Sequence, residues 1–515
     1  MTPLLDAFHR VPTLLAQHVL LAGAALLIGI AISLPLAVWS SRNAVVARIA
    51  LGFASLVQTI PSLALLALFY PLLLWLSGVV GGRIPALGFL PSLIALTLYA
   101  LLPILRNGVA GLDGIDPAVR QAADAVGMTP AQKLRLVEAP LVAPVLIAGI
   151  RTAAVWTIGA ATLSTTVGQP SLGDLIFAGL QTQNWALVLA GCIAAAALAL
   201  VVDALIGLIE RSLRTRRRGL WITGAALLVV GFTAATAPLW TQGSGKPTIV
   251  VGAKNFSEQY ILARVIGDRL EQAGYSVEYR DGLGSAVIFG AVAGGDIDVY
   301  VDYAGTIWTN EMKRRDIPPP TQMVTAIDDW AAKTHDVGLV GALGFENAYA
   351  FAMKADAAKR LGVASLTDLV RAAPRLALGS DLEFLERPEW KAVQRAYPLR
   401  FASATPFSPT FMYRALASGK VDVISAFSSD GRIAADHLTV LTDPRRAIPG
   451  YDAILLVAPK RRGDARFIAA LKPLIGRVNV VAMRAANYQV DRDTDKQSPD
   501  QAAAWLERAI GLTGG

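Results

Sequence analysis

Residues 219–254 read GLWITGAALLVVGFTAATAPLWTQGSGKPTIVVGAK, and two kinds of sequence meet within this stretch. Positions 219–240 form an apolar run long enough to cross a bilayer as a helix. The small and polar residues at 243–247 predict a linker. The β-branched run at 248–253 predicts a buried strand. The stretch therefore predicts a last membrane helix, a linker and the first strand of a soluble domain.

The composition on the two sides of this junction differs sharply. Hydrophobic residues make up 54% of the 515-residue chain, and the mean hydropathy is +0.48. Residues 1–240 hold 14 Lys/Arg and 8 Asp/Glu, whereas residues 241–515 hold 33 and 31. A low density of charge is typical of membrane segments. We therefore expect a transmembrane domain at 1–218, a last helix with a linker at 219–246, and a soluble two-lobed domain at 247–515.

The first part contains six apolar runs long enough to span a membrane. They lie at about 19–39, 50–76, 87–105, 141–166, 185–209 and 219–240. Lys and Arg concentrate in cytoplasmic loops. Alternate loops differ strongly, with 11 Lys/Arg in 40–49, 106–140 and 210–218 and only Arg10 and Arg83 in 1–18, 77–86 and 167–184. This bias predicts that the rich set is cytoplasmic and that everything after residue 241 lies outside.

The longest cytoplasmic loop carries the signals of two short helices. Asp116 precedes Pro117 and can cap the first helix, which we expect to end at Gly127. Thr129 and Pro130 start the second, which we expect to end at Pro140. Such a pair could dock in a groove of another protein or could be a solvated connector, and periodicity alone favours the connector.

Specific motifs in this half resemble a known family. Gln121-Ala122-Ala123, followed by Gly127, is similar to the EAA loop of ABC importer permeases, which engages the ATPase subunit. The family usually has Glu where this chain has Gln121, which removes one charge from that contact. Further segments resemble the osmoprotectant (glycine betaine/carnitine/choline) branch, namely 58–64, 98–107 and 168–174. The resemblance implies an all-α, six-helix membrane domain of the permease type, a separate ATPase subunit, and a homodimer in the lipid of a bacterial inner membrane.

The second part alternates strand-like and helix-like segments, which predicts an α/β fold with mostly parallel sheets. At 275 residues two lobes are favoured over a single sheet. We expect the chain to cross between lobes near 344–348 and 448–453. Ligands of such folds bind at the carboxyl ends of strands. The predicted strands are 248–253, 277–280, 297–301, 349–353, 376–379, 399–402 and 421–425, and the predicted helices are 257–273, 286–294, 465–476 and 499–511.

A second, independent resemblance covers nearly all of 248–510. Residues 251–259 (VGAKNFSEQ), 295–306 (GDIDVYVDYAGT) and 421–431 (VDVISAFSSDG) are similar to segments of the osmoprotectant substrate-binding proteins. It implies a two-lobed, α/β periplasmic-binding-protein domain, located in the periplasm or outside the cell. A permease and a binding protein of one transporter type, joined in one chain, support each other.

The resemblance also implies a ligand site for a quaternary ammonium compound, which aromatic faces hold well. Carried over by motif, the cage residues are Tyr303, Tyr349, Phe427 and Tyr451, where Phe427 replaces the usual Tyr. Gln259, Thr306 and Asn255 are the polar candidates, and Asn255 is equally well explained as a turn residue. Trp308 and Arg387 are further candidates for lining the cleft, although packing or surface is favoured for each, and Tyr300 is assigned to the core. The ligand stays open among glycine betaine, choline, carnitine, proline betaine and ergothioneine.

Other functional classes find little support. The string Gly243-Ser-Gly-Lys246-Pro247 lacks the first Gly and the Ser/Thr of a phosphate loop, so ATP hydrolysis is expected on a separate chain. The four His show no metal spacing, and we expect no metal, no cofactor, no catalytic site and no nucleic acid. A membrane-anchored sensor remains an alternative, opposed by the six spans and by the Gln121 motif. An external enzyme is opposed by the absence of a catalytic cluster.

Overall fold

The structure is a computed structural model that describes residues 3–80, 84–182, 184–215, 218–241, 247–382, 384–407, 409–492 and 494–512. The chain forms two compact units, one made of residues 1–179 with 185–244 and the other of residues 180–184 with 245–515. Arg83, Arg216, Arg217 and most of the predicted linker lie outside the described residues.

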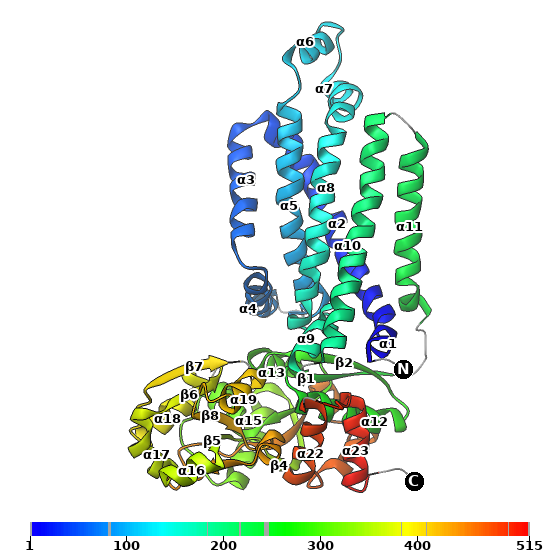
Figure 1. The fold of residues 1–515 in the computed structure, drawn as a ribbon. Helices are drawn as coiled ribbons and strands as arrows, with labels where there is room; N and C mark the ends of the chain where they lie inside the picture. Colours follow the sequence, from blue (N-terminus) through cyan, green and yellow to red (C-terminus); the bar gives the residue numbers. More distant parts are fainter. Residues whose placement is uncertain are drawn as a thin grey trace. The chain divides into compact units, whose positions relative to one another are not determined.

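The described part of the N-terminal unit is helical (Figure 1). Six of its helices are long and apolar enough to cross a membrane, as the sequence predicts, over Val11–Arg42, Ser62–Val80, Phe89–Asp113, Pro130–Val167, Trp185–Leu213 and Gly219–Ala237. The elements are α1 (Pro3–His9), α2 (Val11–Arg42), α3 (Ala44–Thr59), α4 (Ser62–Val80), α5 (Phe89–Asp113), α6 (Pro117–Ala125), α7 (Pro130–Lys133), η1 (Leu134–Glu138), α8 (Ala139–Ala161), η2 (Thr162–Val167), α9 (Gly173–Gln181), α10 (Trp185–Thr215) and α11 (Arg218–Thr241).

The predicted single span at 50–76 is wrong, because two helices occupy this region. Pro61 disfavours helical backbone at the residue before it. Ile60 is accordingly extended, with φ −74° and ψ 126°, and it separates α3 from α4. Figure 1 shows α3 running along the bundle beside α5, whereas α4 is viewed almost along its own axis. The break at Ile60 therefore lets α3 run along the bundle while α4 takes a different direction.

The first short helix of the long connector forms as predicted. The Oδ1 atom of Asp116 accepts a hydrogen bond of 2.8 Å from the amide of Ala118 at the start of α6. Gly127 follows the end of α6 with φ +75°, a conformation that favours glycine. Figure 1 places α6 and α7 together at one end of the bundle, with α1 and α9 at the other. The connector therefore forms one end of this unit.

The second short helix begins as predicted but does not end at Pro140. Thr129 and Gln132 form a capping box at the start of α7. The chain then continues through the π-helical turn η1 into α8, and Pro140 lies in the first turn of α8. Proline has no amide hydrogen, and the wider turn directly before it accommodates the missing hydrogen bond. Pro140 is thus absorbed into a long helix.

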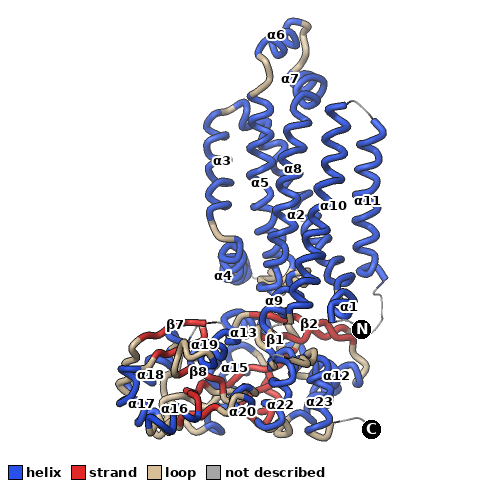
Figure 2. The backbone as a smooth tube through the Cα atoms, in the orientation of Figure 1, coloured by secondary structure: helices blue, strands red, loops and turns tan. Residues whose placement is uncertain are grey.

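The C-terminal unit contains two five-stranded sheets, with orders β2-β1-β3-β10-β4 and β7-β6-β8-β5-β9. Figure 2 shows the strands lying among the helices of this unit. We call the part with the first sheet the first lobe and the part with the second sheet the second lobe. The strands are β1 (Thr248–Lys254), β2 (Ser276–Leu283), β3 (Val299–Tyr303), β4 (Gly338–Glu346), β5 (Tyr349–Lys354), β6 (Ala377–Asp381), β7 (Ser403–Phe407), β8 (Val423–Phe427), β9 (Leu438–Leu441) and β10 (Asp452–Val457).

Helices connect and cover these strands, and two crossings join the lobes. The first crossing lies between Glu346 and Tyr349 and the second between Leu441 and Asp452, close to the predicted places. The longer helices are α12 (Ser257–Gln272), α13 (Ser285–Gly294), α15 (Pro320–His335), α16 (Ala355–Leu361), α17 (Leu366–Ala372), α18 (Pro388–Ala396), α19 (Pro409–Ala417), α21 (Ala465–Leu471), α22 (Val480–Asp491) and α23 (Pro499–Ala509). Helix α22 packs on α12, α23 and β4 of the first lobe.

The sheets are mixed, so the prediction of mostly parallel sheets is wrong. β1 pairs in parallel with β2 and β3, and β6 pairs in parallel with β7 and β8. β10 and β5, which follow the two crossings, are antiparallel to both of their neighbours. Each strand that directly follows a crossing therefore runs opposite to the strands beside it in the sheet. The predicted strand at 399–402 is also wrong, because β7 begins at Ser403.

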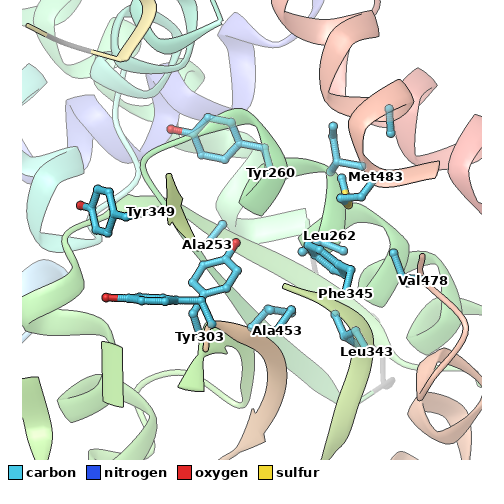
Figure 3. Packing of buried hydrophobic residues seen from close by; sticks show 14 of the residues in the cluster. Ala253, Tyr260, Leu262, Tyr303, Leu343, Phe345, Tyr349, Ala453, Val478 and Met483 are labelled. Carbon is cyan, nitrogen blue, oxygen red and sulfur yellow. The ribbon is translucent and has the colours of Figure 1, made fainter. Parts of the chain in front are cut away.

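The buried core of the C-terminal unit extends to the crossings. Aliphatic side chains such as Leu343, Val478 and Leu262 pack in its interior, and Figure 3 shows Tyr303 and Tyr349 at the margin of this cluster. Burying aromatic rings of this size contributes on the order of 2 kcal/mol each to folding. The same rings are thus part of the core and lie next to the crossings, which places them where a ligand site is expected.

Candidate ligand-binding cavity

A cavity of about 210 Å³ is lined by residues of both lobes. All four predicted cage residues line it, and so do Asn255 and Thr306 among the predicted polar residues. Its lining also includes Lys254, Phe256, Ser257, Glu258, Asn347, Asp381, Arg387, Ser429, Asp430, Arg432, Asn487 and Asp491. The cavity therefore combines an aromatic wall with many polar and charged side chains, and a concave site with aromatic side chains and placed polar groups is typical of small-molecule binding.

Two of the predicted cage rings are neighbours of a third, Tyr349. The ring centroids of Tyr349 and Phe427 lie 5.1 Å apart, and those of Tyr349 and Tyr451 lie 6.0 Å apart with perpendicular planes. Tyr349 and Phe427 are opposite residues of the antiparallel strands β5 and β8, which fixes their separation. Tyr451 comes from the second crossing, directly before β10. Segments distant in sequence therefore bring three aromatic rings to one wall.

Tyr303, the fourth predicted cage residue, ends β3 and is fixed by hydrogen bonds of its hydroxyl group. The hydroxyl donates to Oε1 of Glu258 at 2.5 Å and accepts from Nε2 of Gln259 at 3.0 Å. Its ring is stacked on Phe256 with centroids 6.1 Å apart. Burial, followed by the nearby Glu258 carboxylate, raises the pKa of the Tyr303 hydroxyl well above its usual value. Tyr303 is therefore a neutral, oriented ring at the cavity.

Gln259, which we predicted to contact the ligand, lies behind the described lining of the cavity and not in it. Its side chain is buried, its Oε1 accepts the amide of Lys254 at 3.3 Å, and its amide group donates to Tyr303. It is absent from the described lining residues of the cavity. Gln259 thus reaches the cavity through two lining residues, Lys254 and Tyr303. Thr306 and Asn255 lie at the cavity itself.

Arg387, expected from the sequence to be a packing or surface residue, lines the cavity. Its guanidinium carbon lies 5.4 Å from the ring centroid of Tyr349. The Nε atom of Arg387 is 3.2 Å from Oε2 of Glu389, a carboxylate that also accepts hydrogen bonds from Tyr451 and Thr309. Although burial alone would raise it, the Arg387 guanidinium holds the pKa of Glu389 below its usual value. The cavity therefore has a fixed cation beside the aromatic wall.

A buried ion pair lies behind Tyr303. The Nζ atom of Lys254 is 2.5 Å from Oδ1 of Asp302, and both side chains are almost fully buried. Asp302 also accepts from the Tyr300 hydroxyl and from the Tyr303 amide, each at 2.7 Å. The Lys254 ammonium lies 5.4 Å from the Tyr303 ring centroid. Tyr300 is buried, as predicted, and Trp308 is buried with its Nε1 donating to the carbonyl oxygen of Asp316 at 2.6 Å.

Three lining residues with a shared role were not predicted from the sequence. The buried carboxylate of Glu258 accepts from Nδ2 of Asn347 at 3.1 Å and from Nδ2 of Asn487 at 2.9 Å. Burial raises the pKa of Glu258, and hydrogen bonds from Ser429, Tyr303, Asn487 and Asn347 oppose this rise. Glu258 lies inside the motif 251–259 and Asn347 inside the predicted crossing 344–348, so the sequence offered a reason to consider both as site residues. Asn487 lies on α22 and had no such signal.

The predicted ATPase-coupling residues lie on and just after α6. Gln121 and Ala122 are exposed, Ala123 is buried, and Gly127 is exposed with open space on the side where a Cβ atom would lie. Nearby, Val126 and Leu136 are large apolar side chains with 72% and 61% of their surface exposed. The connector therefore presents apolar as well as polar side chains at its surface.

The chain matches two families of transport proteins. Residues 26–215 match the family described as the binding-protein-dependent transport system inner membrane component. Residues 247–508 match the family described as the substrate binding domain of ABC-type glycine betaine transport system. The two matches fall on the two compact units.

Individual relatives match both units or one of them. The ergothioneine transport permease/ergothioneine binding protein EgtU of Helicobacter pylori is 28% identical over 90% of this chain and 83% of its own length. The choline transport system permease protein OpuBB of Bacillus subtilis is 38% identical over 38% of this chain and 85% of its own. The carnitine transport binding protein OpuCC of Listeria monocytogenes is 28% identical over 48% of this chain and 83% of its own. The chain therefore belongs to the binding-protein-dependent ABC importers, as a multi-pass permease fused to a substrate-binding domain of the glycine betaine type.

Proposed function

We propose that this importer takes up a small quaternary ammonium compound such as glycine betaine, choline or carnitine. The observation that carries the proposal is the meeting of Tyr303, Tyr349, Phe427 and Tyr451 at one cavity. A trimethylammonium group has a spread positive charge and no hydrogen-bond donor, so aromatic faces suit it better than carboxylates or amides do. Each such contact contributes about 0.5–2 kcal/mol.

Arg387 supports a ligand that also carries an anionic end. A guanidinium group binds a carboxylate through paired hydrogen bonds. Arg387 lies beside Tyr349, so a carboxylate within a few bonds of the ammonium group would reach it. This favours a betaine over a simple amine. Ergothioneine, the ligand in the name of the Helicobacter pylori relative, is also a betaine and is the alternative substrate.

Charge and helix directions support one arrangement in the membrane. The Arg-rich connector with α6 and α7 lies at one end of the bundle, and α11 ends at the other (Figure 1). With the Arg-rich end in the cytoplasm, the C-terminal unit is on the periplasmic or extracellular side of a bacterial inner membrane. A ligand captured outside then meets the permease from outside, as import requires. The alternative function, a membrane-anchored sensor, gives no role to the α6–α7 connector.

ATP hydrolysis takes place on a separate ABC ATPase subunit that docks on the connector. The exposed Val126 and Leu136 side chains, with the exposed Gln121, Ala122 and Gly127, offer apolar and small residues for this contact, and the buried Ala123 supports α6. Two copies of the permease in the lipid bilayer would present two such connectors, one for each ATPase. Gln121 carries no charge, so the contact there depends on shape and apolar burial more than on an ion pair.

The ligand class is tested by titrating the full chain in detergent with glycine betaine, choline, carnitine and ergothioneine by calorimetry. Dimethylglycine is the matched control, since it replaces one methyl group of glycine betaine with an N–H donor that ring faces leave unpaired. We expect at least one quaternary ligand to bind about tenfold or more tightly than its tertiary analogue. Binding of dimethylglycine as tightly as glycine betaine, with no quaternary ligand preferred, would refute the proposal.

Single substitutions then test the cage itself. Tyr303→Ala or Tyr451→Ala should weaken binding by about 1–3 kcal/mol, because a cation–π face is lost and a cavity is created. Phe427→Tyr keeps the ring face and should change affinity only modestly. Tyr275→Ala, at a buried ring outside the cavity lining, is the control for general destabilisation. Unchanged binding in both cage variants would show that the ligand sits elsewhere.

A further inference from the structure

The amide groups of Asn347 and Asn487 are held in one orientation by a single buried carboxylate. Nδ2 of Asn347 donates to Oε1 of Glu258, and Nδ2 of Asn487 donates to Oε2. Nδ2 of Asn487 also donates to the carbonyl oxygen of Ser429 at 3.0 Å. A carboxylate and a carbonyl oxygen only accept hydrogen bonds, so both amides must turn their nitrogen toward Glu258.

This orientation leaves two amide oxygens for another partner. The Oδ1 atoms of Asn347 and Asn487 are buried and have no hydrogen-bond partner among the described residues. Both residues line the cavity, and their side chains are nine-tenths or more buried. A buried acceptor without a donor is costly, and a ligand or water that supplies the donor recovers that cost. Two residues of the cavity lining therefore carry buried amide oxygens that lack a donor among the described residues.

Glu258 joins this acceptor pair to the cage. Its Oε1 atom accepts from the Tyr303 hydroxyl at 2.5 Å as well as from Asn347. Asn347 belongs to the first crossing, and its backbone amide donates to the carbonyl oxygen of Tyr451 at 3.0 Å. Asn487 reaches the second lobe through Ser429. One carboxylate thus sets the positions of a cage ring and of two amides from separate elements.

We propose that Glu258 is a positioning residue that determines ligand choice by presenting the Asn347 and Asn487 oxygens as acceptors. The inference rests on the proposed function and adds a substrate class: a quaternary ammonium compound with an O–H or N–H donor a few bonds from the nitrogen. A ligand with acceptors only, such as glycine betaine, leaves both amide oxygens unpaired and relies on Arg387. Glu258 contacts Tyr303 and the amides and acts through them.

A matched ligand pair tests this in the full chain. Choline and its O-methyl ether carry the same trimethylammonium group, but only choline has a donor. We expect choline to bind about tenfold or more tightly, since an unpaired buried acceptor has an effect of this order. Equal binding of the two would overturn the inference while leaving the cage intact. Failure of both, together with every other quaternary ligand, would instead refute the proposed function.

Glu258→Gln tests the role of the carboxylate. A glutamine at this position both donates and accepts, so one asparagine can turn its oxygen toward residue 258 and its amide nitrogen toward the cavity. We expect the preference for choline over its ether to fall at least fivefold and glycine betaine to gain relative to choline. A merely structural role of Glu258 would weaken all three ligands together, and that outcome would overturn the inference.

A second variant keeps the test valid if Glu258→Gln does not fold. Asn347→Leu has nearly the same shape and removes one acceptor oxygen. It should lower the choline-to-ether ratio in the same direction, with ligand-independent melting measured in parallel as the check on folding. Gln272→Leu, at an exposed residue at the end of α12, is the matched control and should leave the ratio unchanged. An unchanged ratio in folded Asn347→Leu would contradict the proposal.

Discussion

The guanidinium carbon of Arg387 lies 5.4 Å from the ring centroid of Tyr349, so a cation of the protein already occupies the neighbourhood of one cage ring. Glu389 neutralises part of its charge, with Oε2 3.2 Å from Nε of Arg387. The same carboxylate accepts the hydroxyl hydrogen of Tyr451. Arg387 and its ion pair with Glu389 thus connect the Tyr349 and Tyr451 rings.

Replacing Arg387 should change the preference among ligands. Arg387→Met keeps a long apolar side chain beside Tyr349 and removes the charge. We expect glycine betaine to lose about tenfold in affinity, or about 1.4 kcal/mol, because its carboxylate loses a donor. Choline, which has no carboxylate, should change by less than about threefold. Calorimetric titration of both ligands against the full chain measures the difference.

A matched arginine serves as the control for this experiment. Arg314 also stacks on an aromatic ring, with its guanidinium carbon 4.1 Å from the Trp308 centroid, and it pairs with Asp316 at 2.7 Å. It is not among the described residues that line the cavity. Arg314→Met should leave both affinities unchanged. Equal losses for glycine betaine and choline in Arg387→Met would mean that Arg387 supports the rings and does not bind a carboxylate.

The four aromatic residues that line the cavity could be placed there from sequence, because Tyr303 and Phe427 end strands inside recognisable motifs and Tyr349 and Tyr451 lie beside the predicted crossings. Arg387 follows the short helical turn Phe384–Glu386, where no periodic pattern marks which way a side chain faces. Glu258 lies next to the predicted Gln259, yet one step along a helix turns a side chain by about 100° and decides which of the two reaches the cavity. Contacts of this kind depend on tertiary packing, which a single sequence does not specify.

Nonlocal pairing explains the errors in the fold prediction. β10 enters the first sheet after the chain has formed the whole second lobe, and it pairs antiparallel to β3. Its direction depends on where the second crossing returns, which local propensity does not encode. The break at Ile60, in contrast, had a visible cause in Pro61, and the long apolar run concealed it.

The conformation of Gly127 predicts a separable effect on transport. Its φ of +75° suits glycine and is tolerated by both asparagine and aspartate, but aspartate adds a negative charge beside the exposed Val126. Gly127→Asp should abolish uptake into cells while ligand binding by the purified chain stays within about twofold of wild type. Gly127→Asn is the control that keeps the size without the charge, and it should retain most uptake. Normal uptake by Gly127→Asp would show that the connector does not couple to an ATPase.

Cysteine labelling tests the side of the membrane on which each unit lies. Val126 on the connector and Val481 on α22 are 72% and 71% exposed, so each tolerates a small replacement. In a Cys192→Ala background, an impermeant maleimide should label Val481→Cys in intact spheroplasts within minutes. Val126→Cys should react only after the membrane is permeabilised. The reverse pattern would place the C-terminal unit in the cytoplasm and exclude the fused-importer arrangement.

Asp491, at the end of α22, predicts a pH dependence of stability in the C-terminal unit. Burial raises its pKa from 3.8 to about 6, the Arg432 guanidinium opposes this rise, and Asp430 adds to it. Ser257 donates to Oδ1 of Asp491 at 2.5 Å, and Lys496 donates to its backbone carbonyl oxygen at 3.3 Å. A buried carboxyl group with a raised pKa binds its proton more tightly in the folded than in the unfolded state.

The sign of the effect follows from proton binding. Between about pH 4 and pH 6 the folded state holds the Asp491 proton and the unfolded state has released it, so the free energy of unfolding falls as the pH rises. Above about pH 6 the loss is complete. Asp491→Asn keeps an acceptor for Ser257 and removes the charge, and it should raise the free energy of unfolding at pH 7.5 by about 1–3 kcal/mol. Urea-dependent proteolysis of the C-terminal unit, measured from pH 4 to pH 8, gives this value.

Asp495→Asn is the matched control, because that carboxylate is 84% exposed and pairs with Arg492 only at the surface. An exposed pair of this kind contributes about 0–1 kcal/mol, so its removal should leave the slope between pH 4 and pH 6 unchanged. Asp491→Asn should flatten the slope while the control retains it. If Asp491→Asn lowers stability at pH 7.5, the electrostatic attraction of Arg432 outweighs burial, and the charged form of Asp491 is the one that the folded state prefers.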